Sequence, residues 1–217
     1  ETAGAGFLNF RLSKDFFEKN VGHILTQDKK WGKNMTKKGE KVMVEYTDPN
    51  PFKEFHIGHL VPNSLGESLA RLIYFCGAKV AKVNYLGDVG LHVAKAIWGI
   101  KKTGKAATAT DLGAGYAAGA HAYEEDTRAK EEIHTINKRV YDRTDKSINS
   151  FYDKGRKLSL QQFELIYKRL GTKFDHYFFE SKTSPLGKEI VLKALEKGIF
   201  EKSDGAIIFR GEKYGLH

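Results

Sequence analysis

The sequence lacks the features that mark secreted, disulfide-bonded and membrane proteins. It contains a single cysteine, Cys76, so no disulfide can form within the chain, and a lone thiol fits a reducing compartment. No apolar run approaches the length of a membrane span, and no charged-then-apolar leader stands at the N-terminus. We therefore expect a cytoplasmic protein with no membrane partner.

Positive charge, by contrast, is abundant. Lys and Arg number 36 against 27 Asp and Glu, which gives a net charge of +9. Clustered cations favour a polyanionic partner because they raise the local affinity for phosphate backbones. Charge alone does not separate nucleic-acid binding from solubility, so both explanations stay open. The 217 residues, of which 41% are hydrophobic, suffice for one or two domains with a packed core.

One stretch, residues 49–60, organises the chain and reads PNPFKEFHIGHL. It lies between an apolar run, Val42–Val44, and a long amphipathic segment that starts near Asn63. A β-rich run, a Pro-broken loop, two histidines around a glycine and then a helix are the layout of a nucleotide site at the end of a parallel strand. We interpret the stretch as an ATP-binding loop.

The chemistry of this loop suits phosphate. A helix that begins near His59 leaves its first N–H groups unpaired and carries partial positive charge at that end. His56 and His59, cationic or neutral, can stabilise negative charge that grows on a phosphate during displacement. Gly58 has no Cβ, so an adenine ring could lie flat against the main chain, and Lys53 is a further phosphate contact. We predict ATP contacts at all four residues and catalytic roles for His56, His59 and Lys53.

The segment His56-Ile57-Gly58-His59 resembles the HIGH signature of class I aminoacyl-tRNA synthetases. A bare H-x-G-H is shared with nucleotidylyltransferases, but an extended frame around it is similar to the arginyl-tRNA synthetase pattern, and a weaker likeness runs from Gly4 to the end. The frame consists of Val44-Glu45-Tyr46, Pro49-Asn50, Lys53, His56, Gly58-His59-Leu60, Gly66, Leu69, Arg71 and Val83–Gly90.

The resemblance implies an arginine–tRNA ligase. Such an enzyme condenses L-arginine with ATP to arginyl-adenylate and passes the arginyl group to tRNA(Arg), with Mg²⁺ on the pyrophosphate oxygens. The family's N-terminal tRNA-binding domain, KMSKS-type loop and anticodon-binding helices would lie outside these residues. We therefore expect a fragment that binds ATP weakly and charges tRNA negligibly by itself. A monomer is expected, with no metal site made by protein residues.

The resemblance also assigns the arginine site, to Glu45, Asn50, His59 and Glu180. A carboxylate in the otherwise apolar strand 41–46 is costly to bury unless a cation pairs with it. Glu45 and Asn50, at the carboxyl end of that strand, match positions that line the arginine site in the family. The alternative for Glu45 is an edge-strand glutamate that points to water.

Glu180 is our choice for recognition of the arginine side chain. Tyr177, Glu180 and Ser181 match the family's Tyr-x-x-Glu-Ser pattern, whose glutamate contacts the guanidinium, a planar fork that suits a carboxylate. Ligands in such folds bind outside the carboxyl ends of the strands, so Glu180 should face the same space as Glu45 and His56. The alternative is an ordinary glutamate at a strand end.

Asp88 lies in the loop Gly87–Gly90 after the second predicted strand, residues 80–85. It is expected on the wall of the same crevice, or else as the cap of a helix over residues 91–100. The chain departs from the family here, because Val89 stands where Trp is common and His92 where Gln is usual.

The resemblance and the periodicity together predict an α/β fold: the first half of a class I synthetase Rossmann-like parallel sheet, with a helical insertion and a small hairpin. A crossover helix over residues 64–76 should cover the sheet, and a third strand over 174–179 should return to it. We expect residues 1–38 to be the tail of an N-terminal tRNA-binding domain plus linker, 39–100 the first βαβ unit with the HIGH motif, 101–171 a linker and helical insertion, and 172–217 the third strand, a helix and the hairpin.

Residues 99–106 nearly spell a phosphate-binding P-loop, but Ala106 stands where Ser or Thr should meet magnesium and a helix precedes the segment. We interpret this segment and the Gly/Ala-rich residues 107–119 as a flexible basic linker. The cations on the insertion helices that follow could meet a tRNA backbone, although a solvated surface explains them too. His121 and His134 are interpreted as surface residues without partners.

Two other functions stay open. A different adenylyl-transferring enzyme could carry the same H-x-G-H loop, although Glu45, Asn50 and Glu180 argue against it. A natural half-synthetase could bind tRNA or nucleotide without catalysis. The sequence past His217 would separate these cases, because a second Rossmann half supports the enzyme and a stop codon supports the binding module.

Overall fold

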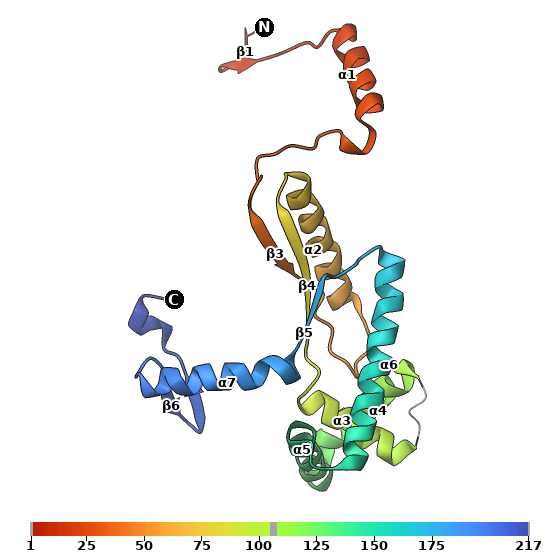
Figure 1. The fold of residues 1–217 in the computed structure, drawn as a ribbon, viewed down its shortest axis with the longest axis vertical. Helices are drawn as coiled ribbons and strands as arrows, with labels where there is room; N and C mark the ends of the chain where they lie inside the picture. Colours follow the sequence, from red (N-terminus) through yellow and green to blue (C-terminus); the bar gives the residue numbers. More distant parts are fainter. Residues whose placement is uncertain (1, 105–107, 217) are drawn as a thin grey trace. The chain divides into compact units, whose positions relative to one another are not determined.

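The structure, a computed structural model, describes residues 2–104 and 108–216 (Figure 1). It divides into two compact units. The first comprises Glu1–Val42 and Arg71–Val80, and the second comprises Met43–Ala70 and Ala81–His217. No helix within the described residues combines the length and the apolar character that crossing a membrane requires.

The first unit contains a small hairpin and one amphipathic helix. Ser13 caps helix α1 by accepting a hydrogen bond from the Phe16 N–H at 3.2 Å. None of the described residues of α1 is buried. The elements are β1 (Thr2–Ala3), β2 (Phe7–Leu8), α1 (Lys14–Gln27) and the 3₁₀-helix η1 (Asp28–Lys30).

A three-stranded sheet in the order β3-β4-β5 carries the predicted site residues at its tips. Strands β4 and β5 are parallel, with Leu86 opposite Phe179, and the arrows of all three strands run the same way in Figure 1. The predicted parallel α/β architecture is confirmed. Strand β3 was expected to be buried, but its residues alternate between exposed and half-buried because it lies at an edge of the sheet. The bounds are β3 Lys41–Glu45, β4 Lys79–Leu86 and β5 His176–Phe179.

Helix α2 (Ile57–Phe75) is the predicted crossover, but it begins earlier and buries a different face. The leucines expected to cover the sheet are exposed: Leu65 is 61% exposed and Leu72 is 62% exposed. The buried face carries Asn63, Gly66, Glu67 and Ala70 instead.

Polar partners explain the buried face of α2. Asn63 donates to the Thr47 hydroxyl at 2.8 Å and accepts from the Thr172 hydroxyl at 2.9 Å. The Tyr46 hydroxyl donates to Glu67 at 2.5 Å. Gly66 lies so close to Tyr46 that a Cβ would overlap its ring. Polar groups that are hydrogen-bonded can be buried at little cost in free energy. The spacing of apolar residues alone therefore predicted the wrong face of α2.

Four helices between β4 and β5 form the insertion, which holds the larger core cluster. The buried face of α5 consists of Ala129, Ile133, Ile136 and Val140. His134 is exposed as expected but has a partner, since its Nε2 lies 3.0 Å from the Tyr123 hydroxyl. The helices are α3 (Leu91–Thr103), α4 (Ala109–Glu125), α5 (Thr127–Asp142) and α6 (Lys146–Leu170).

The prediction of a flexible linker is wrong over residues 108–119. Helix α4 begins there, with a capping box made by Thr108 and Asp111. Its glycines allow close packing on α3: a Cβ on Gly115 would lie 3.0 Å from the Ala96 carbonyl oxygen, and one on Gly119 would overlap the Lys95 backbone. Residues 99–103 of the P-loop-like stretch are helical, and residues 105–107 lie outside the described part of the chain.

The third strand leads directly into α7 (Glu180–Glu196) and a hairpin. Asp204 and Gly205 have positive φ angles of 47° and 79°, which the predicted tight turn requires. Ile190 was expected to face inward but is 65% exposed. The remaining elements are β6 (Glu201–Ser203), β7 (Ala206–Ile208) and the 3₁₀-helix η2 (Gly211–Tyr214).

Candidate functional site

The two histidines of the H-x-G-H segment form a close, tilted pair at the start of α2. Their ring centroids lie 3.9 Å apart. The His56 N–H donates to Nδ1 of His59 at 3.2 Å, and the Gly58 N–H donates to Nδ1 of His56 at 3.0 Å. Because each Nδ1 accepts a backbone hydrogen bond, a neutral imidazole at either position carries its proton on Nε2. The pair therefore offers two Nε2–H donors.

The environment of His59 disfavours its cationic form. His59 is buried, and its pKa is lowered by that burial first and then by the nearby charges of His56 and Lys53. Protonation would also place a hydrogen on Nδ1 and break its bond with the His56 N–H. His56 is exposed.

The packing of the neighbouring imidazole explains why position 58 is a glycine. A Cβ at this position would lie 2.8 Å from Cε1 of His56, so the missing side chain makes room for the imidazole itself. Any contact of Gly58 with adenine stays a prediction.

Lys53 has contacts with Asn50 and Tyr116 and acts electrostatically on two imidazoles. Its N–H donates to the Asn50 carbonyl oxygen at 3.2 Å, and its ammonium lies 4.8 Å from the centroid of the Tyr116 ring. The Lys53 charge lowers the pKa of both His59 and His92. The position therefore brings a cation near both imidazoles.

Asn50 and Glu180 meet at Gly87, at the tips of neighbouring strands. A Cβ on Gly87 would overlap Oδ1 of Asn50 and would lie 3.3 Å from Oε2 of Glu180. Gly87 is buried, and Asn50 and Glu180 are half-buried. The Glu180 pKa is raised, mainly by burial and further by the charge of Asp88. The structure thus brings together two of the four residues predicted to bind arginine, around a position that only glycine fits.

Glu45 is exposed at the end of β3, which agrees with the edge-strand alternative. Its charge contributes to a raised pKa of Asp48, after the larger effect of burial. Asp48 accepts a hydrogen bond from the Tyr85 N–H at 2.8 Å and so ties the loop to β4. A contact between Glu45 and arginine stays a prediction.

Asp88 is completely buried and caps a different helix from the one predicted. Helix α3 begins after Gly90 and has no side-chain cap. Asp88 instead accepts hydrogen bonds from both the N–H and the hydroxyl of Ser181, each at 2.8 Å, in the first turn of α7. The alternative assignment to the helix from Leu91 is wrong, and Asp88 fixes the residue that follows Glu180.

His92 is a site neighbour that the sequence reasoning missed. Its Nε2 lies 2.8 Å from the Gly87 carbonyl oxygen, so Nε2 donates this bond. Burial lowers the His92 pKa more than the hydrogen bond to Gly87 raises it. The role of His92 could have been inferred from its chemistry, because Gln, which is usual at this position in the family, can donate the same hydrogen bond.

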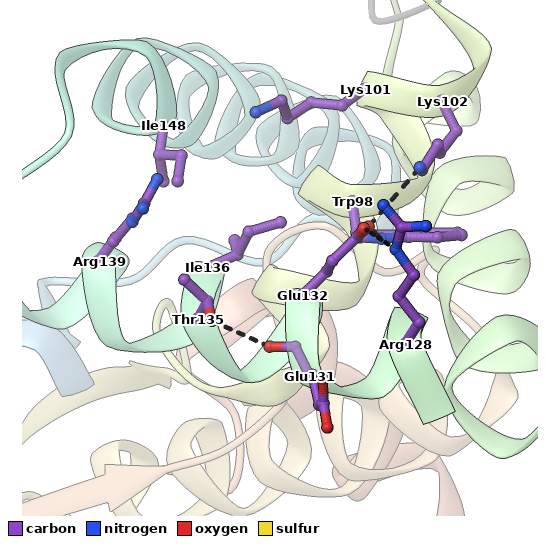
Figure 2. A pocket seen from close by; sticks show the side chains of 10 residues that line it. All are labelled: Trp98, Lys101, Lys102, Arg128, Glu131, Glu132, Thr135, Ile136, Arg139 and Ile148. Atoms are coloured by element: carbon purple, nitrogen blue, oxygen red, sulfur yellow. Dashed lines mark hydrogen bonds and ion pairs between the residues drawn. The ribbon is translucent and has the colours of Figure 1, made fainter. Parts of the chain in front are cut away.

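A hollow of about 560 Å³ lies on the insertion, away from these residues (Figure 2). Glu132 is its main anion: it accepts from Trp98 Nε1 at 2.7 Å and pairs with Arg128 at 3.4 Å and Lys102 at 3.6 Å. These charges largely satisfy one another, so we assign the hollow no role. Within the described residues, no group of three or more His, Cys, Asp or Glu side chains could hold a metal ion.

Comparison with known proteins gives a consistent result. The family described as tRNA synthetases class I (R), catalytic domain, matches residues 20–217. An arginine–tRNA ligase of Treponema denticola is 33% identical over 93% of this chain and 36% of its own length. That of Clostridium perfringens is 29% identical over 97% of this chain and 38% of its own length. The chain thus spans little more than a third of these curated relatives.

Two solved structures share the fold. Arginyl-tRNA synthetase from Plasmodium falciparum has a TM-score of 0.65 at 22% identity and covers 98% of this chain and 38% of its own. The arginyl-tRNA synthetase from Thermus thermophilus has a TM-score of 0.65 at 20% identity and covers 97% of this chain and 35% of its own. At these identities the likeness shows the fold alone.

Proposed function

We propose, from the premise that this chain belongs to the class I arginyl-tRNA synthetase catalytic-domain family, that the whole gene product is an arginine–tRNA ligase. It activates L-arginine with ATP to arginyl-adenylate and pyrophosphate. It then transfers the arginyl group to the 3′ end of tRNA(Arg).

The observation that carries this proposal is the meeting of Asn50 and Glu180 at Gly87. A half-buried carboxylate next to an amide oxygen offers acceptors to a guanidinium, which has only donors and can bond a carboxylate through two parallel N–H groups. Burial of Glu180 supports the pairing, because a cationic ligand restores the charged form that burial disfavours. The Lys53 ammonium, whose charge acts on His59, would then be available to the phosphates.

The first chemical step is an in-line displacement. A carboxylate oxygen of arginine attacks the α-phosphorus of ATP, a new P–O bond forms, and the bond to the bridging oxygen of pyrophosphate breaks. The Nε2–H groups of His56 and His59 donate to phosphate oxygens as negative charge spreads, and the Lys53 ammonium adds positive charge. In the second step a ribose hydroxyl of the terminal nucleotide attacks the arginyl carbonyl, and AMP leaves.

Magnesium is part of the proposal as a companion of ATP. It would neutralise the pyrophosphate oxygens, and the described residues contain no cluster that would hold it without the nucleotide. The net charge of +9 suits a tRNA backbone. We further propose that the protein is a cytoplasmic monomer. The free thiol of Cys76 supports a reducing compartment.

Arginine-dependent exchange between ATP and labelled pyrophosphate, measured on the whole gene product with tRNA present, tests the function. Exchange that requires arginine and fails with other amino acids is the expected result. Exchange with a substrate other than arginine would indicate a different adenylyl-transferring enzyme. Binding of tRNA without any exchange would indicate a non-catalytic module.

A further inference from the structure

One face of helix α6 contacts both loops of the proposed arginine site. Tyr152, Gly155, Arg156 and Ser159 are spaced at i, i+3, i+4 and i+7, so they line one side of a continuous helix. We call these four residues the α6 clamp. Gly155, Tyr152 and Ser159 are buried, and Arg156 keeps 28% of its side chain exposed.

The clamp first holds Phe52, between Asn50 and Lys53. The Phe52 N–H donates to the Ser159 hydroxyl at 2.9 Å. The Phe52 ring is completely buried, stacks on Tyr152 with centroids 6.2 Å apart, and fills the space where a Cβ on Gly155 would stand. Phe52 has a φ of 70°, a conformation that a bulky residue keeps only where its surroundings impose it. The clamp therefore fixes the loop that carries Asn50.

The clamp also holds the residues on both sides of Glu180. The Arg156 guanidinium carbon lies 3.9 Å from the centroid of the Phe179 ring, and its Nε lies 2.9 Å from Oδ2 of Asp88. The Tyr152 hydroxyl donates to the same Asp88 oxygen at 2.9 Å. Asp88 in turn binds Ser181 through two hydrogen bonds. Glu180 is thus bracketed by neighbours that α6 holds.

We propose that the α6 clamp is a positioning element that sets the separation of Asn50 and Glu180, so that the insertion tunes recognition of the guanidinium. This inference rests on the proposed function. A rigid helix that contacts two loops preserves the geometry of a bidentate pair between a guanidinium and a carboxylate. A small displacement of the carboxylate weakens such a pair more than it weakens a contact with a diffuse charge. Arg156 contacts the carboxylate side, through Asp88 and Phe179, so its loss should affect arginine more than ATP.

The test replaces Arg156 in the whole gene product and follows pyrophosphate exchange with tRNA present. For Arg156→Met we expect the KM for arginine to rise about 10- to 100-fold, as when a supporting contact of a binding group is lost, while the KM for ATP changes less than about threefold. Arg156→Lys should restore part of the loss because it keeps the charge on Asp88. Lys154→Met, which removes an exposed cation from the same helix, is the matched control and should change neither constant.

Thermal melting shows whether the variants fold. Where Arg156→Met does not fold, Tyr152→Phe takes its place, because it removes only the hydroxyl on Asp88 and keeps the ring against Phe52. A raised arginine KM with an unchanged ATP KM supports the clamp. An unchanged arginine KM, or equal increases in both constants, overturns it. Wild-type protein that shows no arginine-dependent exchange overturns the proposed function itself, and the two failures are thereby distinguished.

Discussion

The two ends of the proposed site are built in different ways. At the imidazole end, His56, Gly58 and His59 hold one another through backbone hydrogen bonds within four residues of chain. At the carboxylate end, Asp88 and Ser181 are joined across a sequence separation of 93 residues. The proposed phosphate end is thus built by local contacts, whereas the proposed recognition end depends on contacts between distant parts of the chain. The two ends should therefore respond differently to mutation.

The largest effect should come from the imidazole end. His59→Ala removes one neutral Nε2–H donor and should cost about 2.7–4 kcal/mol of transition-state stabilisation, by analogy with the loss of one oxyanion donor. The measurement is kcat/KM for arginine-dependent exchange by the whole gene product. His121→Ala, which removes an exposed histidine of the insertion, is the control and should have no effect. An unchanged rate for His59→Ala would remove this residue from the mechanism.

Next in size is the carboxylate end. Glu180→Gln should weaken arginine binding by about 1.5–3 kcal/mol, the usual range for a hydrogen bond to a charged group, and leave ATP binding unchanged. The exposed Glu189, which pairs with Lys193 on the same helix, gives the matched control Glu189→Gln. A shift in the ATP KM as large as that for arginine would contradict the division between the two ends.

The same substitution has a stability consequence of known sign. Because the folded-state pKa of Glu180 is raised, the stability linked to this group is present below its unfolded pKa and is lost as pH rises through the folded value. At neutral pH the charged carboxylate is therefore a burden to folding. Glu180→Gln should leave the melting temperature of this chain at pH 7 unchanged or higher, and a clear decrease would show that Glu180 has a stabilising partner.

Alanine substitutions of Gly87 and Gly58 allow a direct comparison of the two ends. Gly87→Ala places a methyl group against Asn50 and Glu180, so it should destabilise the chain by about 1–3 kcal/mol, the range for overpacking. Gly58→Ala meets only the exposed His56 ring, which can swing away, so its stability cost should be smaller. Urea unfolding of both variants measures the difference. Equal costs would mean that the two ends are equally rigid.

The smallest effect concerns pH. Burial lowers the pKa of His92, so the stability linked to this residue is present above the unfolded pKa of 6.5 and is lost as pH falls through the folded value. His92→Gln can still donate to the Gly87 carbonyl oxygen but does not titrate. Its unfolding free energy should decline less below pH 6.5, by at most about 1.4 kcal/mol per pH unit, the slope for one proton. Parallel urea titrations of variant and wild type would reveal the change, and identical slopes would exclude it.

The locally encoded features could be predicted from the sequence. The helix start at the H-x-G-H segment follows from its spacing, and the small hairpin follows from the turn chemistry of Asp204-Gly205. Each depends on residues that are close in the chain.

The features that failed depend on distant partners. The buried face of α2 could not be found from apolar spacing, because Asn63 and Glu67 are buried through bonds to Thr172 and Tyr46. The glycines of α4 resembled a linker until α3 was seen to pack on Gly115. The cap that was considered for Asp88 was on the helix next in sequence, although its partner Ser181 lies in α7. The family likeness proposed the arginine-binding residues one by one, and they stay a prediction, but it did not indicate the contacts that support them.

A crystal of the whole gene product with L-arginine and a non-hydrolysable ATP analogue tests the central claim most directly. The account predicts the guanidinium within hydrogen-bond distance of the Glu180 carboxylate and the triphosphate within reach of Nε2 of His56 and His59. A guanidinium bound elsewhere, or a triphosphate away from the start of α2, would contradict it.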